Sequence, residues 1–143
     1  MIWEYSSGII PFREFGSKRT FLLLLSGLTK QELWEFPKGL IEKKERAQEA
    51  ALREFAEETG IDQVELIPGF KKILKYFYRR DEMLVGKTVT YFLGRVKSAK
   101  VHLSSESKDF VWLTFEQALI KIRQKNLREL LTEANDYLDS ANA

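Results

Sequence analysis

The stretch GLIEKKERAQEAALREFAEETGI, residues 39–61, decides how the rest of this sequence is interpreted. At about 100° per residue on a helical wheel, Glu57 and Glu58 fall within about 60° on either side of Glu54, so three carboxylates share one face. The opposite face carries a stripe typical of packing against a core, which is formed by Leu52, Phe55, Ala56 and Thr59. The stretch is therefore expected to be an amphipathic helix with a polar, acidic side.

The carboxylate face is expected to hold a divalent cation. A charged helix face is usually solvated, but carboxylates three and four residues apart repel each other. A hard cation such as Mg²⁺ removes that repulsion and takes oxygen ligands. Ala47, Ala50 and Ala51 lie upstream on the same face and are expected to leave room for a ligand or a second loop. The helix is expected to end at Thr59, with Gly60 as its left-handed cap.

Seven residues of this stretch stand at the spacing of a known motif. They are Gly39, Glu45, Arg53, Glu54, Glu57, Glu58 and Gly60. Their order and separations match those of the Nudix box, and seven fixed positions match by chance with odds on the order of 10⁻⁸ at a given start. The sequence therefore resembles the Nudix hydrolases. One departure is Lys43-Lys44, where many members of that family carry Pro-Gly or a similar turn, so the shape of this loop stays open here.

The resemblance implies metal-dependent hydrolysis of a nucleoside diphosphate linked to another group. It assigns the metal site to Glu54, Glu57 and Glu58, with Mg²⁺ as the expected cofactor and Mn²⁺ as an alternative. Either Glu54 or Glu58 could instead be the base that takes the proton of the attacking water.

By the same resemblance, two further features support the carboxylates. Arg53 lies about 100° from Glu54 and is expected to orient Glu45. Glu49 stands four residues before Arg53 and competes for it, as in an ordinary helix salt bridge. Gly39 is expected to offer its backbone carbonyl to the metal.

Length and composition set the bounds. The 143 residues predict one domain, a single Nudix hydrolase domain over 1–143. A net charge of +2 excludes a general nucleic-acid or membrane binder, so no stable nucleic-acid complex is expected. The lack of cysteine excludes disulfides and thiolate metal sites. The N-terminus does not resemble a signal peptide, and the longest apolar run, 21–25, is too short to span a bilayer. A cytoplasmic monomer or weak dimer is expected.

Periodicity and turn residues divide the rest of the chain. Strands are expected at 2–14, with an interruption around 6–8, and at 19–26, 64–67, 69–80, 86–96 and 109–114. The run at 19–26 is typical of a strand covered on both faces. An irregular connection is expected at 29–39, a hairpin connection at 80–86, and helices at 115–124 and 126–138. This order predicts an α/β fold, a Nudix-type three-layer α/β/α sandwich with a central mixed sheet.

Motifs outside the box point to the substrate. WEFPKG at 34–39, GFKK at 69–72, KTVTYFL at 87–93 and LSSES with FVWL within 103–113 resemble the asymmetrical bis(5′-nucleosyl)-tetraphosphatases. Enzymes of that subfamily use water to cleave diadenosine tetraphosphate into ATP and AMP, by attack on phosphorus. The resemblance implies that Lys38 and Lys87 contact the polyphosphate, that Tyr76 stacks on an adenine, and that Glu106 joins the metal site from the facing loop.

Each of these outer residues also has an ordinary structural role open to it. Tyr76 could be a core aromatic, Glu106 a solvated carboxylate and Lys38 an exposed loop lysine. His102, the only histidine, is expected at a strand edge. The pair Arg79-Arg80 supplies either reserve phosphate contacts or a charged strand end.

Two other functions compete with the tetraphosphatase. One is a pyrophosphohydrolase of nucleoside triphosphates or of RNA 5′ ends, and Lys38 argues against the RNA version because RNA-acting relatives tend to carry Gln at this position. The other is a catalytically silent nucleotide-binding module. Such modules usually lack one or more box glutamates, and here all of them are present.

Overall fold

The computed structural model describes residues 1–27 and 31–141. The part of the chain so described forms seven strands and three helices. In chain order they are β1 (Ile2–Phe15), β2 (Lys18–Ser26), β3 (Trp34–Glu35), β4 (Lys38–Leu40), α1 (Ala47–Thr59), β5 (Glu65–Arg80), β6 (Met83–Arg95), β7 (Ser107–Leu113), α2 (Phe115–Lys121) and α3 (Lys125–Ala141).

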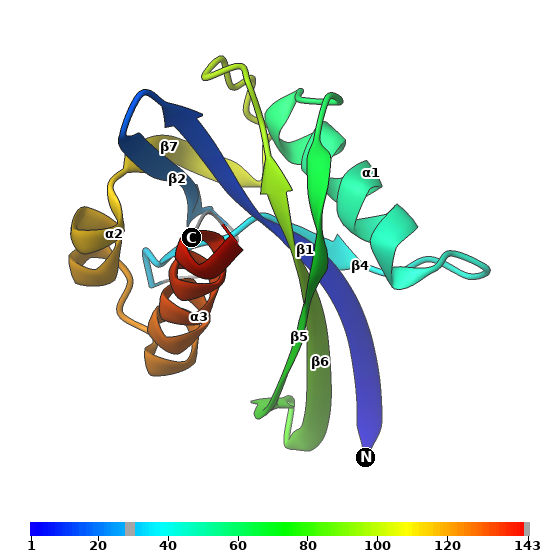
Figure 1. Cartoon of the computed structure of the whole chain (residues 1–143). Coiled ribbons are helices and arrows are strands. Elements are labelled where there is room, and N and C mark those ends of the chain that lie inside the picture. Colours follow the sequence, from blue (N-terminus) through cyan, green and yellow to red (C-terminus); the bar gives the residue numbers. More distant parts are fainter. Residues whose placement is uncertain (28–30, 142–143) are drawn as a thin grey trace.

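All seven strands belong to one mixed sheet. Its main path is β3-β2-β1-β6-β5, with β4 beside β1 and β7 beside β2 (Figure 1). The long strand β1 pairs in parallel with β6, whereas the other pairings are antiparallel. Along its other edge β1 changes partner, pairing with β4 at 6–8 and with β2 at 12–15. The site described below lies near this change of partner, because β4 carries Lys38 and Gly39.

Helices cover both faces of the sheet. Helix α1 lies on one face, and α2 and α3 lie on the other (Figure 1). Phe21 and Leu23 of β2 point into the core under α2 and α3, and Leu22 and Leu24 point into the core under α1. These four side chains are at most 3% exposed. The three-layer sandwich and the strand covered on both faces are therefore confirmed.

Strand β1 runs without the interruption expected around 6–8, so that part of the prediction is wrong. Ser6 and Ser7 are buried and stay in the ladder. The Ser7 hydroxyl lies 2.5 Å from the carbonyl oxygen of Ala47 and 3.2 Å from that of Thr90. A small polar residue is tolerated inside the sheet because the start of α1 and strand β6 supply its hydrogen-bond acceptors.

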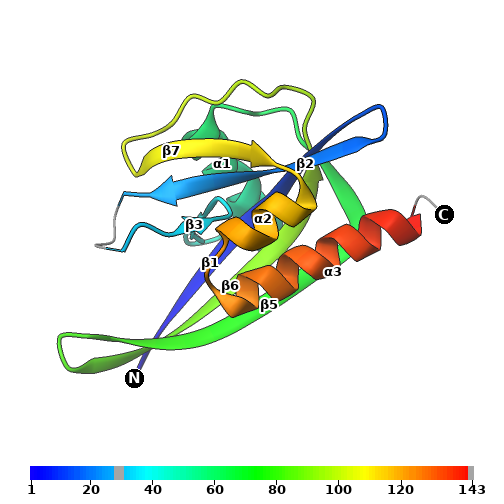
Figure 2. The ribbon, with the colours of Figure 1, turned by 90° about the vertical axis from the view of Figure 1, so that its left-hand side faces the viewer.

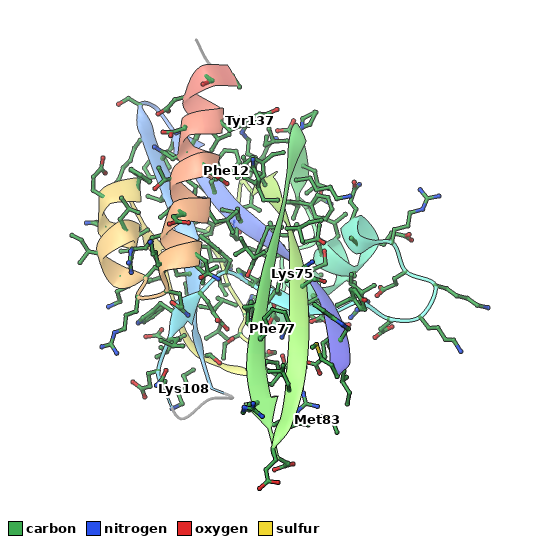
Figure 3. All side chains as sticks on the ribbon, turned by 90° about the horizontal axis from the view of Figure 1, so that it is seen from below. Phe12, Lys75, Phe77, Met83, Lys108 and Tyr137 are labelled. Carbon is green, nitrogen blue, oxygen red and sulfur yellow. The ribbon has the colours of Figure 1, made fainter. Side chains whose placement is uncertain are left out.

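The two segments expected at 64–67 and 69–80 form one strand, β5. An irregularity between Leu66 and Lys71 marks their junction, and Gly69 there has φ of 86°. The connection to β6 is shorter than expected, since only Asp81 and Glu82 lie between the strands, both with positive φ, as in the tightest hairpins. Seen from below, this long hairpin stands out in Figure 3, with Met83 near its end.

The C-terminal helices close the second face. The expected stripe of α3 is buried as predicted and consists of Leu127, Leu130, Leu131, Ala134 and Leu138. Helix α2 ends at Lys121, earlier than expected, and α3 then packs across β5 (Figure 2). His102 lies in a loop, not at a strand edge, and its amide donates to the Thr59 carbonyl at 2.8 Å. The irregular connection expected at 29–39 lies partly outside the described residues, and within its described part the short strands β3 and β4 form, so the prediction missed them. No described helix has the length and hydrophobicity that a membrane crossing requires.

Candidate active site

The ends of α1 are set by local hydrogen bonds. At its start the backbone N–H of Arg46 donates to the Glu49 carboxylate at 3.2 Å. At its end Gly60 has φ of 74° and its N–H donates to the Ala56 carbonyl at 2.8 Å. The predicted helix end and glycine cap are thus confirmed. Glu49 serves the helix start, so it does not compete for Arg53.

The loop before α1 keeps a tight turn without a Pro-Gly pair, although Lys43-Lys44 left its shape open. The Glu45 amide donates to the Glu42 carbonyl at 3.0 Å, and the Glu45 side chain accepts from the Glu42 amide at 2.8 Å. Lys44 has φ of 73°, a conformation in which glycine is more comfortable. The turn is therefore held by Glu45, and Lys44 occupies its left-handed position.

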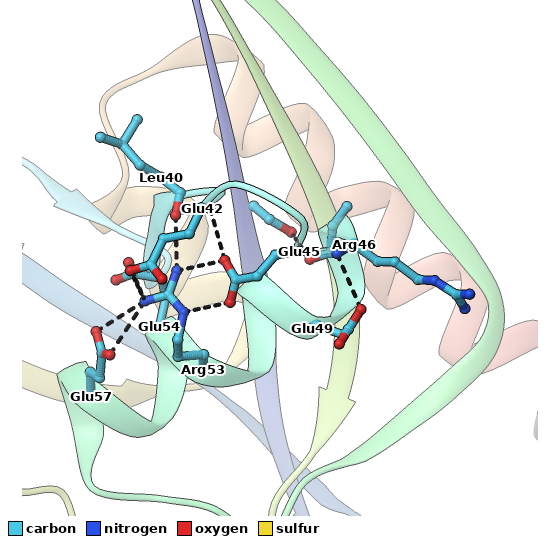
Figure 4. Close-up of polar contacts among 10 residues, drawn as sticks. Leu40, Glu42, Glu45, Arg46, Glu49, Arg53, Glu54 and Glu57 are labelled. Atoms are coloured by element: carbon cyan, nitrogen blue, oxygen red, sulfur yellow. Dashed lines mark hydrogen bonds and ion pairs between the residues drawn. The ribbon is translucent and has the colours of Figure 1, made fainter.

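Arg53 is the centre of the polar contacts in Figure 4. Its Nε and Nη2 donate to the two carboxylate oxygens of Glu45 at 2.6 and 2.9 Å, a bidentate arrangement. Nη2 also donates to the Leu40 carbonyl at 3.0 Å, and Nη1 donates to Glu54 at 3.0 Å and to Glu57 at 3.3 Å. The hydrogen bond from Arg53 is the main cause that lowers the pKa of Glu45. Arg53 thus ties β4 and the turn to the acidic face of α1.

Glu54 lies directly against the backbone of β4. A Cβ atom at Gly39 would stand only 2.0 Å from the carboxyl carbon of Glu54, so no larger residue fits there without moving that carboxylate. Burial raises the pKa of Glu54, although hydrogen bonding to Arg53 opposes the rise. The glycine therefore has a steric reason independent of its carbonyl.

Glu58 is the most deeply placed of the acidic side chains of α1. It is 7% exposed, and its Oε2 has no hydrogen-bond partner among the described residues. Burial, followed by the nearby charge of Glu54, raises the pKa of Glu58 to about 8, while Lys38 acts in the opposite direction. Glu58 lines a cavity of about 70 Å³ together with Lys38, Glu35 and Glu106. A buried, unpaired carboxylate oxygen beside other carboxylates is what a bound cation would satisfy.

Three of the predicted metal ligands act on one another. Burial is the main cause of the raised pKa values of Glu54 and Glu58, and the nearby charge of Glu106, from the loop before β7, adds to both, so the facing loop is near α1 as expected. Within 1–27 and 31–141, no three His, Cys, Asp or Glu side chains are already arranged to hold a metal ion. The donors are all oxygen atoms and one is unpaired, so the set fits Mg²⁺ or Mn²⁺ in chemistry.

Along α1, the carboxylate of Glu57 is exposed, whereas two of the alanines expected on the same face are buried. Glu57 is exposed, and Arg53 holds its carboxylate. Ala50 and Ala51 are fully buried, so the expected room in front of these alanines is wrong. They face the sheet, where small side chains let α1 approach β1 and β4 closely. The carboxylates are held near β4 by this close packing.

The predicted phosphate contacts lie on the side of Lys38. Lys38 pairs with Glu35 at 3.3 Å. Burial lowers the pKa of Lys38, but Glu35 and then Tyr76 outweigh it, and the net pKa is raised. Lys87 stands opposite Tyr76 in the β5–β6 ladder, and burial and then Lys38 lower its pKa. The structure thus brings Lys38, Lys87 and Tyr76 to one region.

A second cavity of about 320 Å³ adjoins this region. Tyr76 and Lys38 line it, and so does Glu35, so the two cavities share Glu35 and Lys38. Tyr76 is half-buried and also packs against the core, so the stacking and core interpretations are compatible. Its ring forms part of a wall that an apolar ligand could reach.

Sequence reasoning missed two acidic residues. Glu35 lines both cavities. The sequence hints at this role only through the spacing of Glu35, three residues before Lys38, with which it forms an ion pair. Glu4 accepts from Arg80 at 2.9 Å and from the Tyr78 hydroxyl, a contact that no local pattern predicts. Arg79 instead donates to the Glu82 carbonyl at 3.3 Å, so the Arg79-Arg80 pair is divided between two partners.

Comparison with known proteins gives consistent matches. The model of the NUDIX domain family matches residues 5–134. The asymmetrical bis(5′-nucleosyl)-tetraphosphatase of Mus musculus is 36% identical over 95% of this chain and 96% of its own. An RNA pyrophosphohydrolase of Nitratiruptor is 40% identical over 54% of each chain. The structure of a C. elegans Ap4A hydrolase binary complex superimposes with a TM-score of 0.84 at 26% identity, covering 96% of this chain and 98% of that one.

Proposed function

Because this chain belongs to the Nudix family of hydrolases, we propose that it cleaves diadenosine tetraphosphate (Ap4A) with water, giving ATP and AMP. The observation that carries the proposal is the pair of adjoining cavities. One is lined by carboxylates and the other by apolar and aromatic side chains, and Lys38 borders both. Such a pair suits a polyphosphate attached to a nucleoside. The relatives named for this activity support the choice of substrate.

The carboxylates of Glu54, Glu58 and Glu106 would hold Mg²⁺ or Mn²⁺, with Glu57 and the Gly39 carbonyl as further proposed ligands. A bound cation there neutralises phosphate oxygens and lowers the pKa of the attacking water. Either Glu54 or Glu58 accepts the proton of that water, and the two roles stay open between them.

The remaining proposed roles concern binding and orientation. Lys38 and Lys87 bind oxygen atoms of the polyphosphate, and Tyr76 stacks on one adenine, an interaction worth about 1 to 3 kcal/mol where it occurs. Arg53 fixes Glu45 and the turn before α1, which keeps the acidic face against β4. Residues 1–143 form one domain in this proposal. The protein acts in the cytoplasm as a monomer or weak dimer and has no stable nucleic-acid or membrane partner.

A second candidate is hydrolysis of pyrophosphate from RNA 5′ ends or from nucleoside triphosphates. The match to an RNA pyrophosphohydrolase favours it, but that match covers only about half of each chain. The tetraphosphatase relative covers nearly the whole of both chains. The first proposal therefore has the broader support.

The deciding experiment compares substrates on the purified protein. With Mg²⁺ present, Ap4A should yield ATP and AMP, and Glu58→Gln should lower kcat at least about 10²-fold through loss of a metal ligand or base. Glu129→Gln, an exposed carboxylate of α3, is the matched control and should keep full activity. Release of pyrophosphate from RNA or triphosphates with inert Ap4A would favour the second candidate. Full turnover by Glu58→Gln would mean that the site lies elsewhere.

A further inference from the structure

One face of the sheet carries exposed apolar side chains beyond the start of α1. Four of them form what we call the hairpin patch: Trp3, Tyr5, Ile73 and Phe77, each 39% to 59% exposed. They lie on the β5–β6 hairpin and the first residues of β1, which extend beyond the helices (Figure 1). Exposed apolar side chains that form one patch mark an interaction surface.

The members of the hairpin patch lie side by side on the sheet. Trp3 pairs with Gly86 of β6, which in turn pairs with Phe77, and the centroids of the two rings are 5.5 Å apart. A Cβ atom at Gly86 would lie only 2.6 Å from the Trp3 ring, so the glycine lets the indole cross β6. Tyr5 and Ile73 share this face, because strand residues two or four positions apart point to the same side. The patch is therefore one surface over three strands.

Helix α1 covers only the neighbouring part of this face. The Ser7 hydroxyl, two residues beyond Tyr5 and on the same side, contacts the carbonyl of Ala47 at the start of α1. Tyr76 precedes Phe77 in β5, so its side chain points to the opposite face, where it lines the second cavity. The hairpin patch is thus separate from the candidate active site, and a partner bound there leaves the second cavity open.

Charges of opposite sign lie at the two ends of the hairpin patch. Asp81 and Glu82 form the turn between β5 and β6, and Lys43 and Lys44 lie in the loop before α1. All four are exposed, and none of them forms an ion pair with another of the described residues. The loop leaves the sheet beside Tyr5, whereas the turn closes the far end of the hairpin (Figure 3). The patch therefore has an acidic end and a basic end.

Two other basic side chains of this face are engaged within the hairpin. The Nζ atom of Lys75 lies 5.6 Å from the centroid of the Trp3 ring, within the range of a cation–π contact. Arg79 donates to the carbonyl of Glu82 at 3.3 Å. A uniformly anionic partner such as nucleic acid would meet the carboxylates at the acidic end. A partner with the same charges in reverse order would match both ends.

A second copy of the chain supplies that reverse order. In a two-fold dimer one patch meets its own copy, so the two hairpins run antiparallel and each acidic turn lies beside the basic loop of the other copy. The four half-exposed side chains offer roughly 300 to 400 Å² per copy, since a large aromatic residue buries about 150 to 250 Å². With the charged ends, the two copies together approach the roughly 1,200 Å² at the lower end of specific interfaces. This size is typical of a weak dimer.

We propose that this chain forms a two-fold dimer through the hairpin patch, with Asp81 and Glu82 of each copy beside Lys43 and Lys44 of the other. The inference goes beyond the proposed function, because it names the surface through which two copies associate. It does not depend on the substrate, since the patch and Tyr76 lie on opposite faces of the sheet.

Sedimentation of the purified chain between about 1 µM and about 1 mM tests the dimer. The wild type should change from monomer to dimer within this range. Phe77→Asp places a charge in the patch and should raise the dissociation constant at least about tenfold, as expected for loss of an aromatic anchor. Ile120→Asp, at an 86% exposed position of α2, is the matched control and should dimerise like the wild type.

Charge reversal tests the antiparallel arrangement. A turn variant, Asp81→Lys with Glu82→Lys, and a loop variant, Lys43→Glu with Lys44→Glu, should each weaken the dimer, because like charges then face each other. An equimolar mixture of the two variants should form a heterodimer with about the wild-type affinity, since every turn then meets a loop of opposite sign. Melting curves verify that each variant is folded, and Phe77→Asp tests the patch independently of these charges.

The possible results separate the occupants of the patch. A wild type that stays monomeric throughout, or equal dimerisation by Phe77→Asp, would overturn the proposal, and so would a mixture of the charge variants that shows no rescue. A monomer that binds a single-stranded oligonucleotide through Phe77 would assign the patch to nucleic acid instead. A dimer that leaves Ap4A intact would support the interface and refute the proposed function, whereas hydrolysis of Ap4A by a strict monomer would do the reverse.

Discussion

At Gly39, the backbone of β4 lies so close to the carboxylate of Glu54 that there is room for a hydrogen atom but not for a side chain. The same carboxylate is held from the other side by Arg53 at 3.0 Å. Glu58, one turn further along α1, is buried with an oxygen that nothing among the described residues satisfies. At the scale of single residues, the carboxylate of Glu54 therefore has little room to move, and one carboxylate oxygen of Glu58 lacks a partner that a bound cation could supply.

Gly39→Ala tests that confinement. The new methyl group would displace the Glu54 carboxylate, the flexible end of a side chain, so the protein should fold with a Tm within about 4 °C of the wild type. Activity should fall about 10²-fold, because displacing a catalytic group by about 1 Å has costs of that order. Steady-state kinetics with a melting curve check this. Leu40→Ala, at the exposed neighbouring position, is the control, and full activity of Gly39→Ala would contradict the steric argument.

The raised pKa of Glu58 predicts how stability changes with pH in the metal-free protein. Between its ordinary pKa of 4.5 and the native pKa of about 8, the folded state keeps a proton that the unfolded chain has released. The free energy of unfolding should therefore fall as pH rises through this window. Urea denaturation in EDTA between pH 5 and pH 8.5 measures the slope.

Two comparisons identify the origin of that slope. Glu58→Gln should flatten it, because the variant has no proton to lose at this position. Saturating Mg²⁺ should also flatten it, since a bound cation favours the ionised carboxylate. A slope that is the same in the wild type and in Glu58→Gln would assign the pH dependence to other groups.

At the scale of elements, α1 is positioned by a turn, by small residues and by a cap. The turn before it places Lys44 at φ of 73°. Ala50 and Ala51 bring the helix close to β1 and β4. Gly60 then ends the helix so that the chain returns to the sheet at β5. The position of the acidic face of α1 thus depends on the turn, the alanines and the cap as well as on the contact between Arg53 and Glu45.

Lys44→Gly should stabilise the protein slightly. A left-handed conformation costs a non-glycine residue about 1 to 2 kcal/mol, which glycine would avoid. Ordering the more flexible glycine backbone costs about 0.5 to 1 kcal/mol, so only part of that stabilisation remains. We expect Tm to rise by a few degrees at most, measured by calorimetry. Lys43→Gly is the matched control, since Lys43 has no positive φ and should lose stability. A lower Tm for Lys44→Gly would show that the lysine side chain contributes to the turn.

At the scale of the whole molecule, the sheet separates two cores, and the candidate site lies along its edge at β4. The core under α2 and α3 includes Tyr91 and Leu131, while the core under α1 includes Phe55 and Ile9. The carboxylates come from the α1 side, and the apolar cavity opens on the α3 side. A substrate that reaches both cavities would therefore depend on both outer layers being in place.

Leu131→Ala tests the contribution of the α3 layer. Leu131 is fully buried, so its truncation should cost about 2 to 5 kcal/mol and lower Tm by at least about 5 °C. Ile120→Ala, at an 86% exposed position of α2, should stay within about 0.5 kcal/mol of the wild type. Thermal and urea unfolding measure both. Equal effects of the two substitutions would mean that α3 is not a structural layer of the native state.

Much of the fold was predictable because its signals are local. The spacing of Phe55 and Thr59 and the glycine at 60 predicted α1 and its end, and the leucine spacing predicted the buried stripe of α3. The continuity of β1 through Ser6 and Ser7 was not predictable, because the groups that satisfy Ser7 come from 40 and 83 residues away. The role of the alanines was mistaken for the same reason, since their neighbour is a strand distant in sequence.

The sequence by itself determined the chemistry: a box of carboxylates at helical spacing, an arginine placed to hold Glu45, and a resemblance strong enough to assign the family. Periodicity and motif spacing carry this information without any tertiary contact. Only the tertiary structure decided that one carboxylate oxygen of Glu58 is buried without a hydrogen-bond partner among the described residues, that Glu35 joins Lys38 between two cavities, and that Tyr76 lines the second one. Those properties depend on elements far apart in the chain, and no local pattern encodes which of them become neighbours.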